Sequence, residues 1–206
     1  MSRRIAVFAS GTGSNFDAIM KAVEADRLDC EVALLICDRP GAKVIEKART
    51  YGVTTFVFDP KNYPSKADFE QEIVTELKKV EVEWLVLAGY MRLIGLTLLH
   101  AYPSNIINIH PSLLPAFPGK DAIGQAFEAG VKVTGVTIHY VDEGMDTGKI
   151  IEQEALYVEE GESRDSLQQR IQAIEHKLYP ATIQTILNLG DKRRERGTKH
   201  EEKSTT

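Results

Sequence analysis

The chain has 206 residues, of which 43% are hydrophobic and 27% are charged, close to the usage of ordinary globular proteins. These proportions exclude a wholly disordered chain, a collagen and a coiled coil. The formal net charge of −5 argues against a basic surface that binds nucleic acid or membranes. The longest apolar run, residues 84–91, is far too short to cross a bilayer. We therefore expect a cytoplasmic protein with neither a nucleic-acid nor a membrane partner.

Five short apolar runs in the first half of the chain predict buried strands of a parallel sheet. Segments with apolar residues at helical spacing separate them, as in right-handed crossover units. The strands are expected at residues 5–9, 32–37, 54–58, 84–88 and 106–109, and the helices at residues 14–23, 42–49, 65–80 and 96–101. This order predicts an α/β fold with a doubly wound, mostly parallel open sheet.

After a further helix expected at residues 122–129, strands and helices no longer alternate. Residues 131–141 and 150–158 both have strand patterns, and no helix separates them, so an antiparallel pair is expected. A long C-terminal helix should begin at Ser163, and Pro180 should bend or break it. Residues 191–206 are dominated by mixed charges, which predicts a disordered tail after a single domain of residues 1–190.

The two cysteines, Cys30 and Cys37, do not have the spacing of a redox or zinc motif. Both lie in or beside an apolar run, so they are interpreted as buried thiols. So few cysteines fit a reducing compartment. No spacing of His, Cys, Asp or Glu is typical of a metal site, and we expect no metal.

A glycine-rich turn, Gly-Thr-Gly-Ser-Asn at residues 11–15, joins the first strand to the first helix. Free N–H groups and the helix dipole at such a position attract an anion such as phosphate. The turn lacks the Walker lysine and does not match GxGxxG. The alternative is a tight turn that binds nothing.

Asn108 and His110 are two residues apart at the end of the fifth strand, so they share a face of the sheet. An amide donor and an imidazole on one rigid face suit a developing oxyanion and a proton transfer. The alternative is a histidine that hydrogen-bonds only to backbone.

The loop at residues 141–148 joins the last two strands and carries three carboxylates. One of them could reach His110 and orient its ring, or the loop could be a solvated hairpin turn. His139 ends the preceding strand, either as a second catalytic group or as a polar strand residue.

Five segments together resemble those of the glycinamide ribonucleotide formyltransferases, a branch of the folate-dependent formyltransferase family. The segments are residues 10–15 (SGTGSN), 87–92 (LAGYMR), 108–119 (NIHPSLLPAFPG), 135–148 (GVTIHYVDEGMDTG) and 175–180 (EHKLYP). The resemblance extends from residue 5 to about residue 186. It implies a Rossmann-like formyltransferase fold and transfer of the formyl group of 10-formyltetrahydrofolate to the amine of glycinamide ribonucleotide, in purine synthesis.

The resemblance also implies roles for particular residues. The catalytic set would be Asn108, His110 and Asp146. The ribonucleotide would be held by Gly11, Thr12, Gly13, Ser14, Asn15 and Glu175. The folate would be held by Met91, Arg92, Leu93, Tyr140, Val141, Asp142, Glu143 and Gly144. These small molecules are the expected partners, and a homodimer is compatible with the sequence.

Residues 120–123 (Lys-Asp-Ala-Ile) differ from the more apolar, His-containing stretch of many formyltransferases. The family's details of folate binding at this loop therefore do not carry over to this chain. Relatives that share the Asn–His–Pro motif leave other activities open. The deformylase has an extra N-terminal domain and the methionyl-tRNA enzyme an extra C-terminal domain, and we expect neither here. A sugar-nucleotide amine formyltransferase and a non-catalytic folate- or nucleotide-binding module are further alternatives.

Overall fold

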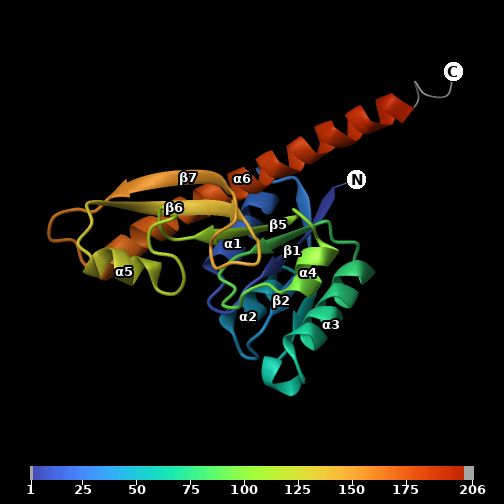
Figure 1. Cartoon of the computed structure of the whole chain (residues 1–206), viewed down its shortest axis with the longest axis horizontal. Coiled ribbons are helices and arrows are strands. Elements are labelled where there is room, and N and C mark those ends of the chain that lie inside the picture. Colours follow the sequence, from blue (N-terminus) through green and yellow to red (C-terminus); the bar gives the residue numbers. More distant parts are fainter. Residues whose placement is uncertain (1, 202–206) are drawn as a thin grey trace.

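A single seven-stranded sheet forms the centre of the computed structural model, which describes residues 2–201, with the backbone alone for residues 190–201. The strands lie in the order β3-β2-β1-β4-β5-β6-β7 (Figure 1). They are β1 (Arg3–Phe8), β2 (Cys30–Cys37), β3 (Thr55–Val57), β4 (Trp84–Leu87), β5 (Ile106–His110), β6 (Val133–Tyr140) and β7 (Ile150–Tyr157). The first five strands pair in parallel, and β6 and β7 are antiparallel to their neighbours. The predicted doubly wound sheet with an antiparallel C-terminal pair is confirmed.

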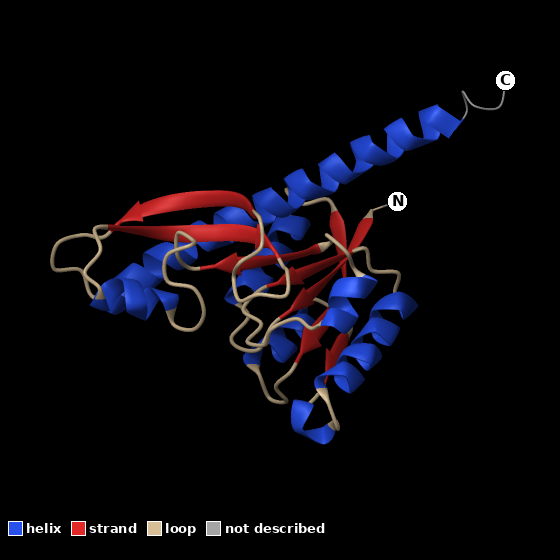
Figure 2. Cartoon of the chain, in the orientation of Figure 1, coloured by secondary structure: helices blue, strands red, loops and turns tan. Residues whose placement is uncertain are grey.

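Helices cover both faces of this sheet (Figure 2). They are α1 (Ser14–Glu24), α2 (Lys43–Thr50), the 3₁₀ turn η1 (Pro60–Asn62), α3 (Lys66–Lys79), α4 (Leu96–Ala101), α5 (Ala122–Glu128) and α6 (Arg164–Glu201). Only η1 among these has no counterpart in the sequence prediction. Ser65 caps α3 through Asp68 N–H, as its residue type predicts.

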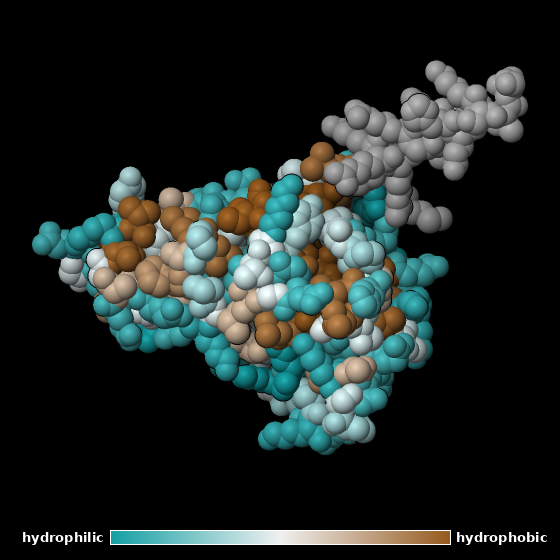
Figure 3. Space-filling view, viewed as in Figure 1, coloured by the Kyte–Doolittle hydropathy of each residue, from teal (hydrophilic) through white to brown (hydrophobic). Residues whose placement is uncertain are grey.

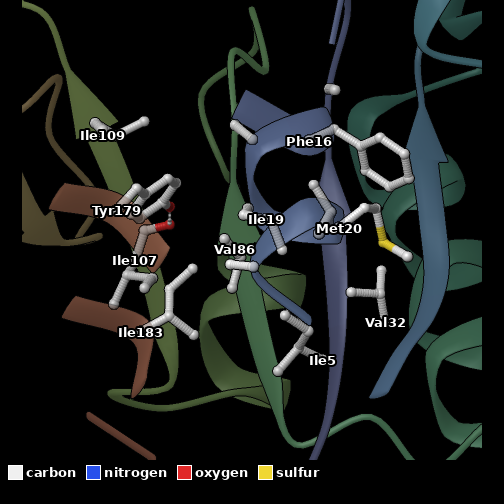
Figure 4. Packing of buried hydrophobic residues seen from close by; sticks show 14 of the residues in the cluster. Ile5, Phe16, Ile19, Met20, Val32, Val86, Ile107, Ile109, Tyr179 and Ile183 are labelled. Atoms are coloured by element: carbon white, nitrogen blue, oxygen red, sulfur yellow. Dashed lines mark hydrogen bonds between the residues drawn. The ribbon is translucent and has the colours of Figure 1, made fainter. Parts of the chain in front are cut away.

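The alternation of side chains along β1 produces two separate cores. Ile5 and Val7 pack on one face against residues of α1, α2 and α6, and Figure 4 shows Phe16 and Ile19 of α1 in this cluster. Ala6 and Phe8 pack on the other face against α3 and α4. Strands buried on both faces explain why the first half of the sequence shows continuous apolar runs rather than alternation.

The sequence predicts a bend or a break at Pro180, and helix α6 continues through this residue, so there is no break. Proline removes one helical N–H donor, which usually weakens or kinks a helix. Here the residues around it are firmly packed, since Tyr179 is fully buried and Ile183 is 1% exposed. Tertiary packing therefore compensates for the lost hydrogen bond.

The backbone of residues 191–201 continues α6 beyond the body of the molecule (Figure 1). Lysine, arginine and glutamate have high helix propensity, so a charged segment can extend a helix past its last buried turn. Residues 202–206 of the expected disordered tail lie outside the described residues. The proposed domain limit at residue 190 stays a prediction.

Hydrophilic residues cover most of the face seen in Figure 3. Apolar residues gather in the middle of this face and on the arm formed by β6 and β7, where Val133, Ile150 and Tyr157 are exposed. None of the described helices is long and apolar enough to cross a membrane.

Candidate active site

A cavity of about 630 Å³ opens at the carboxyl ends of the parallel strands. Ligands of open α/β sheets bind at this edge, because loops there follow several strands at once. Many predicted site residues line it: Asn15, Met91, Arg92, Leu93, Asn108, His110, Val141, Asp142, Gly144, Asp146 and Glu175. Six others do not: Gly11, Thr12, Gly13, Ser14, Tyr140 and Glu143.

The register of the central strands brings Asn108 next to His139. Asn108 is paired with His139 in the antiparallel ladder of β5 and β6, so their side chains share one face of the sheet. His139 Nδ1 donates to the backbone oxygen of Tyr140 at 2.8 Å. Its Nε2 atom can then accept from Asn108 Nδ2, which lies 3.2 Å away. This contact orients the amide, and Nδ2 also makes a longer contact, 3.5 Å, with Asp146 Oδ1.

Asp146 lies where Asn108, His110 and His139 converge. Its Oδ2 accepts from Gly119 N–H at 2.7 Å and is 3.4 Å from His110 Nδ1. Its Oδ1 is 3.5 Å from Asn108 Nδ2 and 3.7 Å from His139 Nε2. Burial opposes ionisation of this carboxyl, but the contacts with His139, Gly119 and His110 outweigh it and lower its pKa below the ordinary value. Asp146 is therefore a carboxylate at neutral pH.

His110 is held by the proline-rich loop that follows β5. Its Nε2 lies 2.8 Å from the backbone oxygen of Phe117 and must donate, because a carbonyl only accepts. Ser112 closes this loop by donating to the backbone oxygen of Ala116 at 2.6 Å. The other ring nitrogen, Nδ1, faces Asp146 and is the one available for proton transfer in the cavity.

At one position of the glycine-rich turn, Gly13, the backbone has the conformation that the sequence suggests. Gly13 adopts φ 69° and ψ 40° as the N-cap of α1, a left-handed conformation that glycine adopts without strain. A Cβ at Gly13 would lie 2.5 Å from Val44 Cγ2, so α2 packs directly against the turn. Lys47 of α2 donates to the backbone oxygen of Gly13 at 3.3 Å, which adds a positive charge beside the turn.

Asn15 and Glu175 connect this turn to α6 inside the cavity wall. Asn15 Nδ2 donates to Glu175 Oε2 at 3.1 Å. Burial raises the pKa of Glu175 to about 7, despite the hydrogen bond from Asn15. Asn15 Oδ1 is buried and has no hydrogen-bond partner among the residues that the structure describes. A buried acceptor of this kind is suited to a donor supplied by a ligand.

The segments predicted to hold the folate differ in how they meet the cavity. Met91 and Leu93 follow β4, line the cavity and are 56% and 49% exposed. Asp142 also lines it, but its Oδ1 accepts from Gly144 N–H and from Thr147 Oγ1, which stabilises the loop after β6. Glu143 lies outside the lining.

Several lining residues were not assigned from the sequence. Their side chains are basic or amide groups that could bind anions or hydroxyls: Arg39, Lys120, Gln168 and Gln172. Gln168, Gln172 and Glu175 recur along α6 at spacings of four and three, a pattern that could have indicated one helix face toward the cavity. Arg39 and Lys120 have no such pattern. In the described part of the chain, no group of three or more His, Cys, Asp or Glu could hold a metal ion.

Comparisons with known proteins agree with this fold. The family model described as formyl transferase matches residues 3–183. A phosphoribosylglycinamide formyltransferase of Bacillus subtilis (strain 168) is 56% identical over 190 residues, which are 92% of this chain and 97% of that protein.

Two solved structures are similarly close. The crystal structure of glycinamide ribonucleotide transformylase 1 from Geobacillus kaustophilus has a TM-score of 0.89 and 60% identity, covering 91% of this chain and 100% of that one. The crystal structure of phosphoribosylglycinamide formyltransferase from Bacillus halodurans has a TM-score of 0.88 and 58% identity, covering 90% and 95%. A family match over most of the chain and relatives of this identity lead to one conclusion: the chain belongs to the formyl transferase family.

Proposed function

We propose that this protein transfers the formyl group of 10-formyltetrahydrofolate to the amine of glycinamide ribonucleotide, a step of purine synthesis. The observation that carries the proposal is the convergence of Asn108, His110 and His139 on Asp146 in the cavity wall. Relatives with nearly the same length have this activity in their names. A protein that only binds ligands has no need of an acid and an oxyanion donor side by side.

Formyl transfer between two amines needs a stabilised tetrahedral intermediate and a proton transfer. The amine nitrogen of the ribonucleotide bonds to the formyl carbon, and the carbonyl oxygen takes the negative charge. The second N–H of Asn108, which otherwise makes a long 3.5 Å contact with Asp146 Oδ1, and the Nδ1–H of protonated His110 donate to this oxygen. The bond from the formyl carbon to the folate nitrogen then breaks, and the oxygen regains its double bond.

Protons balance because the attacking amine loses one and the leaving folate nitrogen gains one. Asp146 is ionised and lies within 3.4 Å of His110 Nδ1. It accepts the amine proton, which then passes to the folate nitrogen, directly or through water. The cavity holds both substrates, so the attack is effectively unimolecular.

The substrates are assigned to opposite parts of the cavity. Residues 11–15 would hold the phosphate through N–H groups at the start of α1, with Asn15 and Glu175 on the ribose or glycinamide part. Met91, Arg92 and Leu93 on one side, with residues 140–144 on the other, would hold the folate. Residues of the turn that do not line the cavity, Gly11 to Ser14, would act through their backbone.

The deciding experiment follows tetrahydrofolate release from 10-formyltetrahydrofolate with and without glycinamide ribonucleotide. Release that requires the ribonucleotide and yields its N-formyl product supports the proposal. Release without it would identify a deformylase, with water as acceptor. Binding of folate without turnover would indicate a binding module or another amine acceptor, such as a sugar nucleotide.

We also propose that the protein works in the cytoplasm. Cys30 and Cys37 are both free and buried. Burial raises the pKa of both thiols, that of Cys30 to about 12, so neither is poised for oxidation. A chain without a disulfide fits a reducing compartment.

A further inference from the structure

The loop of residues 89–95, which follows β4 and lines the cavity, is held from behind by buried polar groups. Asp38, at the end of β2, is 3% exposed. Its Oδ1 accepts from Ser10 Oγ at 2.5 Å, and its Oδ2 accepts from Arg92 Nε at 2.8 Å. A buried carboxylate is costly unless it is paired and hydrogen-bonded, and here both oxygens are satisfied.

Ser10 extends this network to the backbone of the loop. Its hydroxyl donates to Asp38 and accepts from Met91 N–H at 2.9 Å. Its own N–H donates to the backbone oxygen of Gly89 at 3.0 Å. The segment before the glycine-rich turn and the loop after β4 are therefore joined through one serine and one carboxylate.

Two further contacts fix the rest of the loop. The ring of Tyr90 packs edge-on against Phe8, with centroids 5.3 Å apart. Glu70 of α3 is buried and accepts from Gly95 N–H at 2.6 Å, at the start of α4. Between these anchors, Met91 and Leu93 remain about half exposed at the cavity. The loop thus presents apolar side chains on a fixed backbone.

Asp38 also determines how Arg92 is presented. The contact uses the Nε atom of Arg92, and the Arg92 side chain is 41% exposed. Over residues 2–189, where side chains are described, the two terminal nitrogens of Arg92 have no hydrogen-bond partner. Their N–H groups have the planar fork geometry that binds a carboxylate in two places.

We infer that Asp38 is a positioning residue for the formyl donor, acting through Arg92 and through Ser10 and Met91. This inference rests on the proposed function, because it assumes that the donor is the folate and that residues 91–93 hold it. Asp38 touches no cavity ligand itself, since it does not line the cavity. Its loss should weaken donor binding without affecting the acceptor site.

The test compares Asp38→Asn with a matched control, Glu162→Gln. The carboxylate side chain of Glu162 is also 2% exposed and has an arginine partner at 2.8 Å, Arg170, but it lies outside the cavity lining. We expect Asp38→Asn to raise KM for 10-formyltetrahydrofolate about tenfold, with KM for the ribonucleotide and kcat changed less than twofold. Glu162→Gln should leave all three within twofold. Equal effects of the two variants, or a rise in both KM values with Asp38→Asn, would overturn the inference.

A double-mutant cycle separates positioning through Arg92 from a general loss of structure. Arg92→Gln should itself raise the donor KM, and adding Asp38→Asn should then raise it clearly less than tenfold, because only the route through Ser10 and Met91 remains. Independent, multiplying effects would mean that Asp38 does not act through Arg92, which contradicts the inference. If Asp38→Asn fails to fold, Ser10→Ala leaves the ion pair intact and should still raise the donor KM severalfold. An unchanged donor KM in that variant would count against the network.

Calorimetric titration with 10-formyltetrahydrofolate alone distinguishes a failure of the proposed function from a failure of the positioning role of Asp38. If the wild type shows no transfer but binds the donor, the proposed function fails, and about tenfold weaker binding by Asp38→Asn still supports positioning. If the wild type transfers formyl groups and Asp38→Asn binds the donor normally, the positioning role fails and the proposed function stands. If the wild type does not bind the donor at all, both fail.

Discussion

His110 presents Nδ1 to Oδ2 of Asp146 at 3.4 Å while its Nε2 donates to the backbone oxygen of Phe117. One nitrogen is thus committed to the protein backbone, and the other faces a carboxylate in the cavity. The arrangement fixes the ring plane and assigns the exchangeable proton to a single atom. It also explains why a loop rich in proline follows β5, since the Phe117 carbonyl must not move.

Asp146→Asn should lower kcat about 10²–10⁴-fold, the contribution typical of a group that transfers a proton in catalysis. An amide in place of the carboxylate cannot accept the amine proton. Steady-state measurement of tetrahydrofolate release would show the effect. Folding should be retained, because an amide oxygen can still accept from Gly119 N–H. A variant with near-normal kcat would remove Asp146 from the mechanism.

The same substitution should change how stability depends on acid. The pKa of Asp146 is lower in the folded protein than its ordinary value of 3.8. Its contribution to stability is therefore present above pH 4 and is lost as the pH falls through the folded pKa. Chemical unfolding between pH 6 and pH 2.5 should show a shallower acid loss for Asp146→Asn than for the wild type. Identical slopes would indicate that the carboxylate gains nothing from its partners.

Gly13→Ala and Gly11→Ala should separate folding from ligand binding in the glycine-rich turn. Alanine at Gly13 would keep a positive φ and place its Cβ against Val44, costing about 1–3 kcal/mol of unfolding free energy. A Cβ at Gly11 meets no atom within 4 Å and requires no positive φ, so stability should stay unchanged. If residues 11–15 hold the phosphate, both variants should raise the ribonucleotide KM more than the folate KM. A selective rise in the folate KM would mean that the two substrate sites are reversed.

Glu175→Gln should stabilise the protein at pH 8 and remove the dependence of its unfolding free energy on pH that ionisation of Glu175 causes. Because the folded pKa of about 7 lies above the ordinary 4.5, the group's contribution is full below pH 4.5 and is lost as the pH rises toward 7. The difference between these two pKa values corresponds to about 3 kcal/mol of unfolding free energy. Glutamine keeps an oxygen for Asn15 Nδ2 and cannot ionise. Thermal unfolding of both proteins at pH 5 and pH 8 would measure the difference, and a Gln variant no more stable at pH 8 would contradict it.

The order of elements could be predicted because the signals are local. Continuous apolar runs identified β1, β2, β4 and β5, and helical spacing identified the helices between them. Whether Pro180 breaks the helix could not be decided from the sequence, because the outcome depends on the packing of Tyr179 and Ile183, which the local sequence does not reveal. Tertiary contacts here override an intrinsic preference.

Part of the site could likewise be predicted from local sequence, and part could not. Asn108 and His110 could be placed on one face from a spacing of two, and the resemblance to formyltransferases suggested Asp146. The contact of Asn108 with His139 depends on the register of β5 against β6, which the sequence left undetermined. Asp38 was missed because it belongs to no motif and acts on the cavity only through Ser10 and Arg92.

The hydroxyl of Tyr179 crosses the interior to the sheet, donating to the backbone oxygen of Leu87 at 2.8 Å with that of Ile107 3.3 Å away. Leu87 is the last residue of β4, and Ile107 lies one residue before Asn108. Glu175, one turn earlier on α6, lines the cavity. A slide of the helix by a single residue would break this bond and withdraw Glu175 together with it. Tyr179 therefore fixes the position of α6, and with it the acceptor side of the cavity, relative to the strands β4 and β5.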